Sequence, residues 1–463
     1  MKSIKHTLFM ISLIMLQALT FSCAENKENS ESPISQEDDA SLTLGMIVSD
    51  EYALSKVREY NKTNPKYKVE IVEYSSLYDT VEKAIEKFNL DIISGDAPDI
   101  IVGKGLDMDS MANKGVFADL YRFIDNDEEL SRESFVPCVL YSNEYDGQLL
   151  TINMTFEIQT VLGDTEYFGE KMNQTAREMI SAYKNCSDES VEFTYHESRE
   201  NMFDRFIISN YNSFIEAETN NLTFDEEKFC EMLEFVNDFE SESTMLENTD
   251  YLDYADSTEF ALNEGKVMTV ETIIEDFRVF HNLLAGSLKG RPMTVIGYPS
   301  ENGDGTKISY PTYLGKYSIL ESSDKKEEAW DFIRYFLTEE RQLEGADDEL
   351  SKFPVNQNAF DIMAEQSKLT QIDKYGKEVT HSYIYGNEII DIGNCTDDEI
   401  QMIYDIIDSV DAVSMGSAYS GISDFWTEVC TEECQAFFNG DKTAEETADI
   451  IINRISIYIA EKG

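Results

Sequence analysis

Strand patterns and helix patterns alternate in the first quarter of the chain, and this alternation constrains the fold more than any other feature. Residues 42–48 (LTLGMIV), 68–74 (KVEIVEY) and 99–102 (DIIV) have the composition of strands. The second alternates apolar and polar side chains with a period of two, and the third is short and apolar, as buried parallel strands are. Between them, residues 53–60 and 81–92 carry apolar side chains at helical spacing. This order predicts an α/β fold.

The same two periodicities continue through the rest of the chain. Residues 149–162 form an extended apolar stretch, and a helix is predicted over residues 325–337. Trp330 lies on the apolar face of that helix, so we expect its indole in the core. Further strands are predicted near residues 267–270, 293–298 and 315–320, and further helices near 229–239 and from 443 onward.

The N-terminus has the layout of a secretory signal. Lys2 and Lys5 precede an apolar stretch over residues 7–21, and no acidic residue occurs before Glu25. The apolar stretch is shorter than the roughly 20 residues that span a bilayer. We therefore predict that residues 1–22 are a signal peptide that is removed on export.

The end of this signal, residues 19–23 (LTFSC), resembles a bacterial lipobox, in which a small residue precedes a lipidated cysteine. Thr20 replaces the leucine that is usual three places before the cysteine. Residues 24–40 have almost no large apolar side chain, so we expect a disordered acidic tether. We predict that Cys23 is lipidated and anchors the chain to the outer face of the bacterial cytoplasmic membrane. The alternatives are a plain cleaved signal or an uncleaved anchor.

The chain is strongly acidic, with 37 Lys and Arg against 91 Asp and Glu and a net charge of −54. Such a charge repels nucleic acids and anionic lipid surfaces, so we expect neither as a partner. It also disfavours a polyanionic ligand. A neutral or cationic solute remains compatible with it.

Six cysteines follow Cys23, an even number that permits disulfides in an exported chain. Six cysteines allow fifteen pairings, so the sequence does not select one. Cys430 and Cys434 are four residues apart, and a disulfide between them on one helix would strain the geometry. Buried reduced thiols are the simpler interpretation, and a metal site is the weaker alternative because no histidines cluster with the cysteines.

A series of short motifs runs in a fixed order through the chain. It comprises SGDAPDII (94–101), GVFADL (115–120), FALNEGKVM (260–268), YPS (298–300), KEEAWDFIRY (326–335), FPVN (353–356) and FFNGDKTAEE (437–446). Each motif is weak alone. Their order and spacing over residues 42–461 resemble the extracellular solute-binding proteins of ABC importers, of the carbohydrate-uptake type (family 1).

The resemblance implies an α/β fold of two lobes, the type II periplasmic-binding-protein-like fold, in which crossing hinge strands join the lobes. It implies lobe one at residues 41–152 and 316–360, and lobe two at residues 155–313 and 362–461. It further implies capture of a mono- or oligosaccharide by closure of the lobes and delivery to an ABC permease in the membrane. We expect a monomer that needs no cofactor and no metal and is not an enzyme.

The candidate ligand contacts follow from the rule that open α/β sheets bind ligands beyond the carboxyl ends of their strands. Saccharides need carboxylates and amides for their hydroxyls and aromatic faces for their C–H surfaces. The positions selected in this way are Asp50, Tyr52, Tyr74, Ser75, Lys104, Asp107, Phe156, Glu157, Glu271 and Tyr313. Trp426 is added because it lies near the position where the maltose-binding branch of the family has a tryptophan that stacks on sugar.

Other functions remain open at this point. The chain has no G-x-S-x-G, no H-E-x-x-H and no P-loop, which disfavours the enzymes that use those motifs. A binding protein for a polyamine, a peptide or a metal, or a ligand sensor on the same fold, remains an alternative to saccharide uptake. The sequence does not identify the solute.

Overall fold

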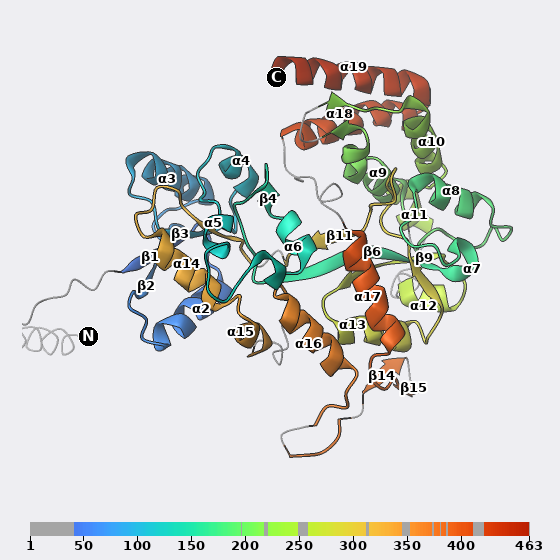
Figure 1. Ribbon diagram of the computed structural model, residues 1–463. Coiled ribbons are helices and arrows are strands. Elements are labelled where there is room, and N and C mark those ends of the chain that lie inside the picture. The colour runs from blue at the N-terminus through green and yellow to red at the C-terminus, as the bar shows by residue number, and fades with distance from the viewer. Residues whose placement is uncertain are drawn as a thin grey trace, which may run out of the picture. The chain divides into compact units, whose positions relative to one another are not determined.

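The computed structural model describes residues 41–195, 197–216, 221–248, 258–311, 314–344, 352–372, 375–379, 381–385, 388–410 and 421–462 (Figure 1). The predicted signal peptide, Cys23, the tether and Tyr313 lie outside the described residues.

The first sheet confirms the strands predicted near the start of the chain. It has the order β12-β3-β1-β2, in which β1 (Leu42–Met46), β2 (Val69–Glu73) and β3 (Ile100–Val102) run parallel. The fourth strand, β12 (Tyr317–Ile319), comes from much later in the sequence and pairs antiparallel with β3. The carboxyl ends of three neighbouring parallel strands therefore lie at one edge of this sheet.

Two helices connect these parallel strands. α2 (Glu51–Lys62) buries Ala53, Val57 and Tyr60, and α3 (Val81–Ser94) buries its own apolar stripe. α3 ends at Gly95, which has φ of 82°, a backbone conformation that residues with a side chain adopt at a cost.

The second sheet is built around one long strand, β6 (Thr155–Asp164). It pairs antiparallel with β9 (Thr269–Ile274), β10 (Met293–Val295) and β11 (Lys307–Ser309). β13 (Phe353–Pro354) pairs with its first residues. All the partners of β6 are antiparallel, so this sheet can leave one face polar, which a parallel sheet covered by helices cannot.

The chain crosses between the two sheets at least twice. The first crossing leads from the first sheet to β6. Before it reaches β6, Ile152 exchanges backbone hydrogen bonds of 2.9 and 2.8 Å with Tyr317 of β12. The chain later returns from β11 to β12, and residues 314–316 lead directly into β12. The two crossing segments therefore lie side by side at Ile152 and Tyr317.

The remaining helices cover the two sheets (Figure 1). α14 (Lys326–Tyr335) contains Trp330, which is buried as predicted and donates a hydrogen bond to Asp127 at 2.9 Å. α16 (Gln357–Ser367) runs through the lobe boundary expected at 360–362. The other elements of the first part are α4 (Met108–Asn113), α5 (Tyr121–Ile124), η1 (Arg132–Ser134), α6 (Pro137–Tyr141), β4 (Glu144–Tyr145) and β5 (Gln148–Leu149).

Two further groups of elements follow β6. The first is α7 (Thr165–Phe168), α8 (Ala176–Lys184), α9 (Arg199–Phe206), η2 (Ile208–Ser213), β7 (Ile215–Glu216), β8 (Asn221–Leu222), α10 (Glu226–Asn237), α11 (Glu242–Asn248), α12 (Thr258–Asn263), α13 (Phe277–His281) and η4 (Asn282–Ser287). The second is α15 (Glu339–Glu344), β14 (Ser382–Tyr385), β15 (Glu388–Asp391), α17 (Asp397–Ser409), α18 (Gly421–Phe438) and α19 (Ala444–Lys462). Among the described helices, none is both long and apolar enough to cross a bilayer.

The six cysteines of the described residues are all free thiols. Cys430 and Cys434 both lie on α18, where they are buried in the core that α18 shares with α8, α9, α10 and α19. Burial raises the pKa of both thiols, which keeps them protonated and unreactive. Four of the free thiols, Cys138, Cys395, Cys430 and Cys434, are buried as in the simpler interpretation, and Cys186 and Cys230 are half-buried.

Candidate functional site

The carboxyl end of β1 leads to Asp50, the first of the predicted ligand contacts. Asp50 is only 1 % exposed. Its Oδ1 accepts a hydrogen bond from the backbone N–H of Ala53 at 3.0 Å, and its Oδ2 accepts one from the backbone N–H of Gly315 at 3.1 Å. Both oxygens therefore bind the protein itself and hold the crossing segment beside α2. Tyr52, two residues later, is half-buried and packs against the core.

The carboxyl end of β2 supplies Tyr74 and Ser75. Tyr74 is 2 % exposed, and its hydroxyl donates to Oδ2 of Asp91 at 3.0 Å. Burial, followed by the hydrogen bond to Asp91, raises the pKa of Tyr74. Ser75 is half-buried, and its hydroxyl donates to Glu73 at 3.2 Å. Of the two, Ser75 is the one that a ligand can reach.

Lys104 and Asp107 follow β3 at the same edge. Lys104 is half-buried, and its side chain has neither a hydrogen bond nor an ion pair within the residues that the structure describes. The residue before it, Gly103, donates its backbone N–H to the carbonyl of Lys316 at 2.8 Å, which places Lys104 beside the crossing segment. Asp107 is exposed and caps α4 by accepting from the backbone N–H of Ser110 at 2.9 Å.

The two predicted contacts on β6 point in opposite directions. Phe156 is fully buried and stacks on Phe353 with 5.3 Å between ring centroids, so it belongs to the core. Glu157 lies on the other face, where its Oε1 accepts from the hydroxyl of Ser309 at 3.1 Å and its Oε2 lies 3.7 Å from Nζ of Lys352. Glu157 thus belongs to a polar surface of the second sheet, which the pairing register defines.

Opposed residues of antiparallel strands share a face. Glu157 opposes Ser309, and Gln159 opposes Lys307 on one side and Ile273 on the other. Glu271 of β9 also belongs to this face, because it is two residues from Ile273. We call these six residues the polar face of the second sheet. The alternate residues Phe156, Ile158, Ile274 and Ile308 lie in the core behind it.

Glu271 is the centre of a hydrogen-bonded group on this face. Arg205 of α9 donates from Nη2 to Glu271 at 2.6 Å, and the hydroxyl of Tyr298 donates to the other oxygen of Glu271. From Nη1, Arg205 also donates to Glu197 at 3.0 Å. Glu197 is nearly inaccessible, with 4 % of its side chain exposed, whereas 42 % of the Glu271 side chain is exposed. The carboxylate of Glu271 is therefore held in place by two donors, and part of it remains accessible to solvent.

Lys307 lies on the same face near this group. It is half-buried, and its Nζ lies 5.5 Å from the ring centroid of Tyr298. Its side chain has no hydrogen bond and no ion pair within the described part of the chain. Burial lowers the pKa of Lys307, an effect that the more distant carboxylates of Asp204, Asp304 and Glu271 only partly oppose.

Trp426, the remaining predicted contact, lies in a hydrophobic core. It is fully buried, its ring stacks on Phe214 with 5.4 Å between centroids, and its Nε1 donates to the carbonyl of Ile207 at 3.2 Å. Both the ring and its N–H are thus used within the protein. We leave Trp426, Phe156, Tyr74 and Asp50 out of the candidate ligand surface, since all four are buried and contact the protein itself.

Two of the predicted residues lie beside one crossing segment, the one that leads from β11 to β12. Asp50 and Lys104 contact it at residues 314–316, and Lys307 and Ser309 begin it in β11. Sequence reasoning missed Gln159, Lys307, Ser309, Arg205 and Tyr298. Gln159 could have been found from the sequence, because the polar residues Glu157 and Gln159 alternate with apolar neighbours in β6. The others depend on pairings between distant segments.

Comparisons with known proteins indicate the family to which the chain belongs. A model of the family described as bacterial extracellular solute-binding protein matches residues 56–373, more than half of the chain. This chain belongs to that family. A comparison with the curated proteins finds no match.

Solved structures show the fold of this solute-binding protein. An extracellular solute-binding protein family 1 from Alicyclobacillus acidocaldarius is 15 % identical and has a TM-score of 0.54, covering 91 % of this chain and 98 % of its own. The sugar-binding protein MalE from Xanthomonas citri is 14 % identical with a TM-score of 0.52, again covering 91 % and 98 %. The expected α/β fold of two lobes is therefore confirmed.

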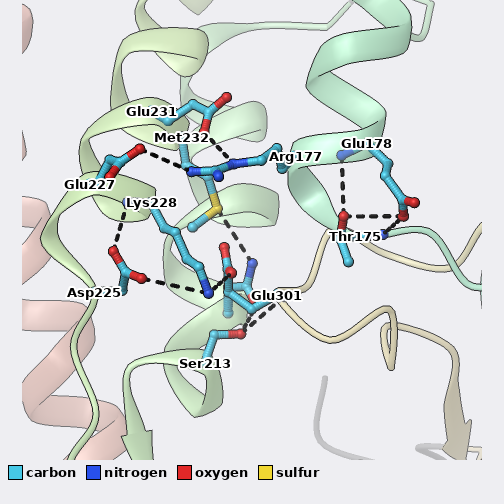
Figure 2. A network of polar contacts seen from close by, with 11 residues as sticks. Thr175, Arg177, Glu178, Ser213, Asp225, Glu227, Lys228, Glu231, Met232 and Glu301 are labelled. Atoms are coloured by element: carbon cyan, nitrogen blue, oxygen red, sulfur yellow. Dashed lines mark hydrogen bonds and ion pairs between the residues drawn. The ribbon is translucent and has the colours of Figure 1, made fainter.

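The solute-binding protein also has a surface pocket away from the polar face, of about 1140 Å³, between α8, α10 and the start of α19. Figure 2 shows the charged side chains beside it. Arg177 donates to Glu231 at 2.8 Å, and Lys228 lies 2.7 Å from Glu301. Arg177 also lies 3.7 Å from Glu227, and Lys228 lies 3.7 Å from Asp225, so each cation has two carboxylate partners. We assign this network to the packing of α8, α10 and the loop at Glu301.

Proposed function

We propose that the chain captures a carbohydrate between the carboxyl edge of the first sheet and the polar face of the second sheet. The observation that carries this proposal is the group around Glu271. Its two carboxylate oxygens are held by Arg205 and Tyr298, so the acceptor is positioned before a ligand arrives. Preorganised polar groups lose little conformational entropy on binding, which favours recognition of a hydroxyl-rich solute.

The polar face has the variety of groups that a sugar needs. Glu271 is an acceptor for hydroxyl protons, Gln159 offers both a donor and an acceptor, and Ser309 can serve as either. Glu157 is only 6 % exposed and holds Ser309 in place. Tyr298 adds an aromatic ring beside them, suited to the C–H surface of a pyranose. The similar fold of the Xanthomonas citri protein, whose description is sugar-binding, is consistent with this proposal.

Capture proceeds in this proposal by closure of two lobes. Lobe one comprises residues 41–152 and the segment from 316, and lobe two comprises residues 155–313 and the C-terminal part. We place the last crossing before α16 instead of at 360–362, because a helix moves as one rigid element. A ligand stabilises the closed form only by the difference between its affinities for the closed and open forms.

The captured solute then passes to an ABC permease, which binds the closed form of this monomeric protein. Lipidated Cys23 keeps the protein at the outer face of the cytoplasmic membrane after residues 1–22 are removed. Residues 24–40 are the tether between the lipid and the folded body. This segment has only one large apolar side chain, that of Ile34, which supports that role.

A ligand screen tests the proposal. Residues 24–463 are heated with mono- and oligosaccharides, and with polyamines and short peptides as controls. A ligand present at about 100 times its dissociation constant adds about 2.7 kcal/mol of stability, which raises the melting temperature. A response to one saccharide class is expected. Responses to a polyamine or peptide alone would contradict the carbohydrate assignment and leave the fold intact.

A matched pair of variants locates the site. Glu271→Gln replaces the fixed carboxylate on the polar face, and Glu231→Gln replaces a carboxylate that pairs with Arg177 in the network of Figure 2. We expect the first change to weaken saccharide binding at least about tenfold, since a hydrogen bond to a charged group contributes about 1.5–3 kcal/mol. Isothermal titration calorimetry should show no change for the second. Equal affinities for both variants would move the site elsewhere.

A further inference from the structure

Two lysines of the candidate site differ from the other lysines of the described residues. Lys104 and Lys307 are half-buried, yet among the described residues their side chains make neither a hydrogen bond nor an ion pair, and Lys307 has only the ring of Tyr298 at 5.5 Å from its Nζ. Other half-buried lysines have carboxylate partners, as Lys56 and Lys442 do. Lysines without a partner, such as Lys114, are exposed to water.

This lack of partners is unusual in this chain. Asp and Glu outnumber Lys and Arg by 91 to 37, so a partly buried cation has many possible carboxylate neighbours. An ammonium group that loses part of its hydration without gaining a partner is unfavourable. Such a group persists where another function requires it, and a ligand of opposite charge would supply the missing partner.

The two lysines belong to the two proposed walls of the site. Lys307 opposes Gln159 on the polar face of the second sheet. Lys104 follows β3 of the first sheet, next to residues 315–316 of the crossing segment. Gly315 is eight positions after Lys307, so their Cα atoms are at most about 29 Å apart. An oligosaccharide of several units can therefore reach both lysines.

We propose that the bound saccharide is acidic, with the carboxylates of uronic acid units pairing with Lys307 and Lys104. This inference rests on the proposed saccharide site and specifies its substrate class. The strongly acidic surface does not oppose it, because charges further than about 8–10 Å away are screened at physiological salt. The carboxylates of Asp204, Asp304 and Glu271 act on the charge of Lys307, and they would repel a densely charged polyanion more than an isolated carboxylate.

Calorimetry on residues 24–463 tests this substrate class. The probes are di- and trisaccharides of galacturonate, glucuronate and mannuronate, each compared with the neutral sugar in which the carboxylate is reduced to a primary alcohol. We expect one uronate series to bind at least about tenfold more tightly than its neutral counterpart. Equal affinity of the two would overturn the acidic class and keep the carbohydrate function. Binding of neither would overturn both.

Variants of Lys307 and Lys104 test whether these two lysines cause the preference for uronates. Lys307→Met and Lys104→Met keep the aliphatic stem and remove the charge, and Lys307→Arg keeps a cation. The Met variants should lower the ratio of uronate affinity to neutral-sugar affinity about tenfold or more, and the Arg variant should retain most of that ratio. Lys114→Met, at an exposed position, is the control. A preference that survives both Met changes, in proteins with unchanged melting temperatures, would contradict the assignment.

Discussion

Glu197 is a buried carboxyl with only half of its hydrogen-bonding capacity used. Its Oε2 accepts from Arg205, and its Oε1 is buried without a hydrogen-bond partner. Burial raises the pKa of Glu197 to about 7, since the lowering effect of Arg205 is smaller than the cost of desolvating the charge. The side chain therefore takes up a proton in the folded state at a pH where the unfolded chain has already lost it.

This pKa gives a pH dependence with a defined sign. Because the folded pKa lies above the unfolded value of 4.5, the folded state binds more protons between pH 4.5 and 7, and stability falls as pH rises through this range. The loss is on the order of 2–3 kcal/mol at about 1.4 kcal/mol per pH unit. The Glu197→Gln variant should lack this pH dependence of stability.

Urea unfolding at pH 4.5 and pH 8 measures this effect. The free energy of unfolding of the Gln variant relative to the parent should rise by about 2–3 kcal/mol between the two pH values. Glu189→Gln, at an exposed position, controls for the lost charge. A difference that does not change with pH would show that Glu197 is ionised in the folded state throughout.

Substitution of Trp426 distinguishes a role in the hydrophobic core from a role in ligand binding. It is fully buried against Phe214, so Trp426→Ala should lower the free energy of unfolding by about 3–5 kcal/mol through the cavity it leaves. Denaturant unfolding followed by circular dichroism gives this value. An unchanged free energy of unfolding combined with lost saccharide affinity would place the indole on the ligand, as the sequence suggested.

At the scale of elements, the crossing segment is fastened to the first sheet through one carboxylate. Asp50 caps α2 with one oxygen and accepts from the backbone N–H of Gly315 with the other. The same side chain thus sets the start of a helix and the path of the segment that leads from β11 to β12. A residue chosen for ligand contact from its position after a strand here has a structural role.

Removing that carboxylate should destabilise both elements. Asp50→Ala loses the cap and leaves a buried N–H without an acceptor, so we expect a loss of about 2–3 kcal/mol in the free energy of unfolding. Asp50→Asn retains one acceptor oxygen and should lose about half as much. Thermal unfolding of both variants compares them. Equal losses would indicate that the bond to Gly315 contributes nothing.

At the scale of the whole molecule, net charge opposes compactness. The chain has a net charge of −54, and its carboxylates repel one another most strongly at low ionic strength. The Debye length falls from about 30 Å at 0.01 M to about 8 Å at 0.15 M salt. Screening by salt should therefore increase the stability of the folded state.

Raising sodium chloride from about 0.01 to 0.15 M should therefore increase the melting temperature by a few degrees. Chloride is preferable to sulfate, because sulfate strengthens the burial of apolar surface by itself. Sucrose at equal osmolarity is the control for general exclusion effects. A melting temperature that is independent of chloride would mean that the ion pairs already balance the repulsion.

The periodicity of the chain determined its local structure. The strands near residues 42, 69 and 100, the helices between them and the burial of Trp330 were predicted correctly, because each depends on side chains close in sequence. The order of short motifs was enough to indicate the family. Composition indicated the acidic surface, and it left open whether the cysteines are paired.

Only the tertiary structure decided which candidate residues share a surface. Position after a strand is a local property, and it did not distinguish exposed Asp107 from buried Tyr74. The polar face depends on the register of β6 with β9 and β11, strands separated by more than a hundred residues of sequence. Because the side chains of a strand alternate between faces, a register shift of one residue would have placed Phe156 where Glu157 lies, and a local pattern does not contain that register.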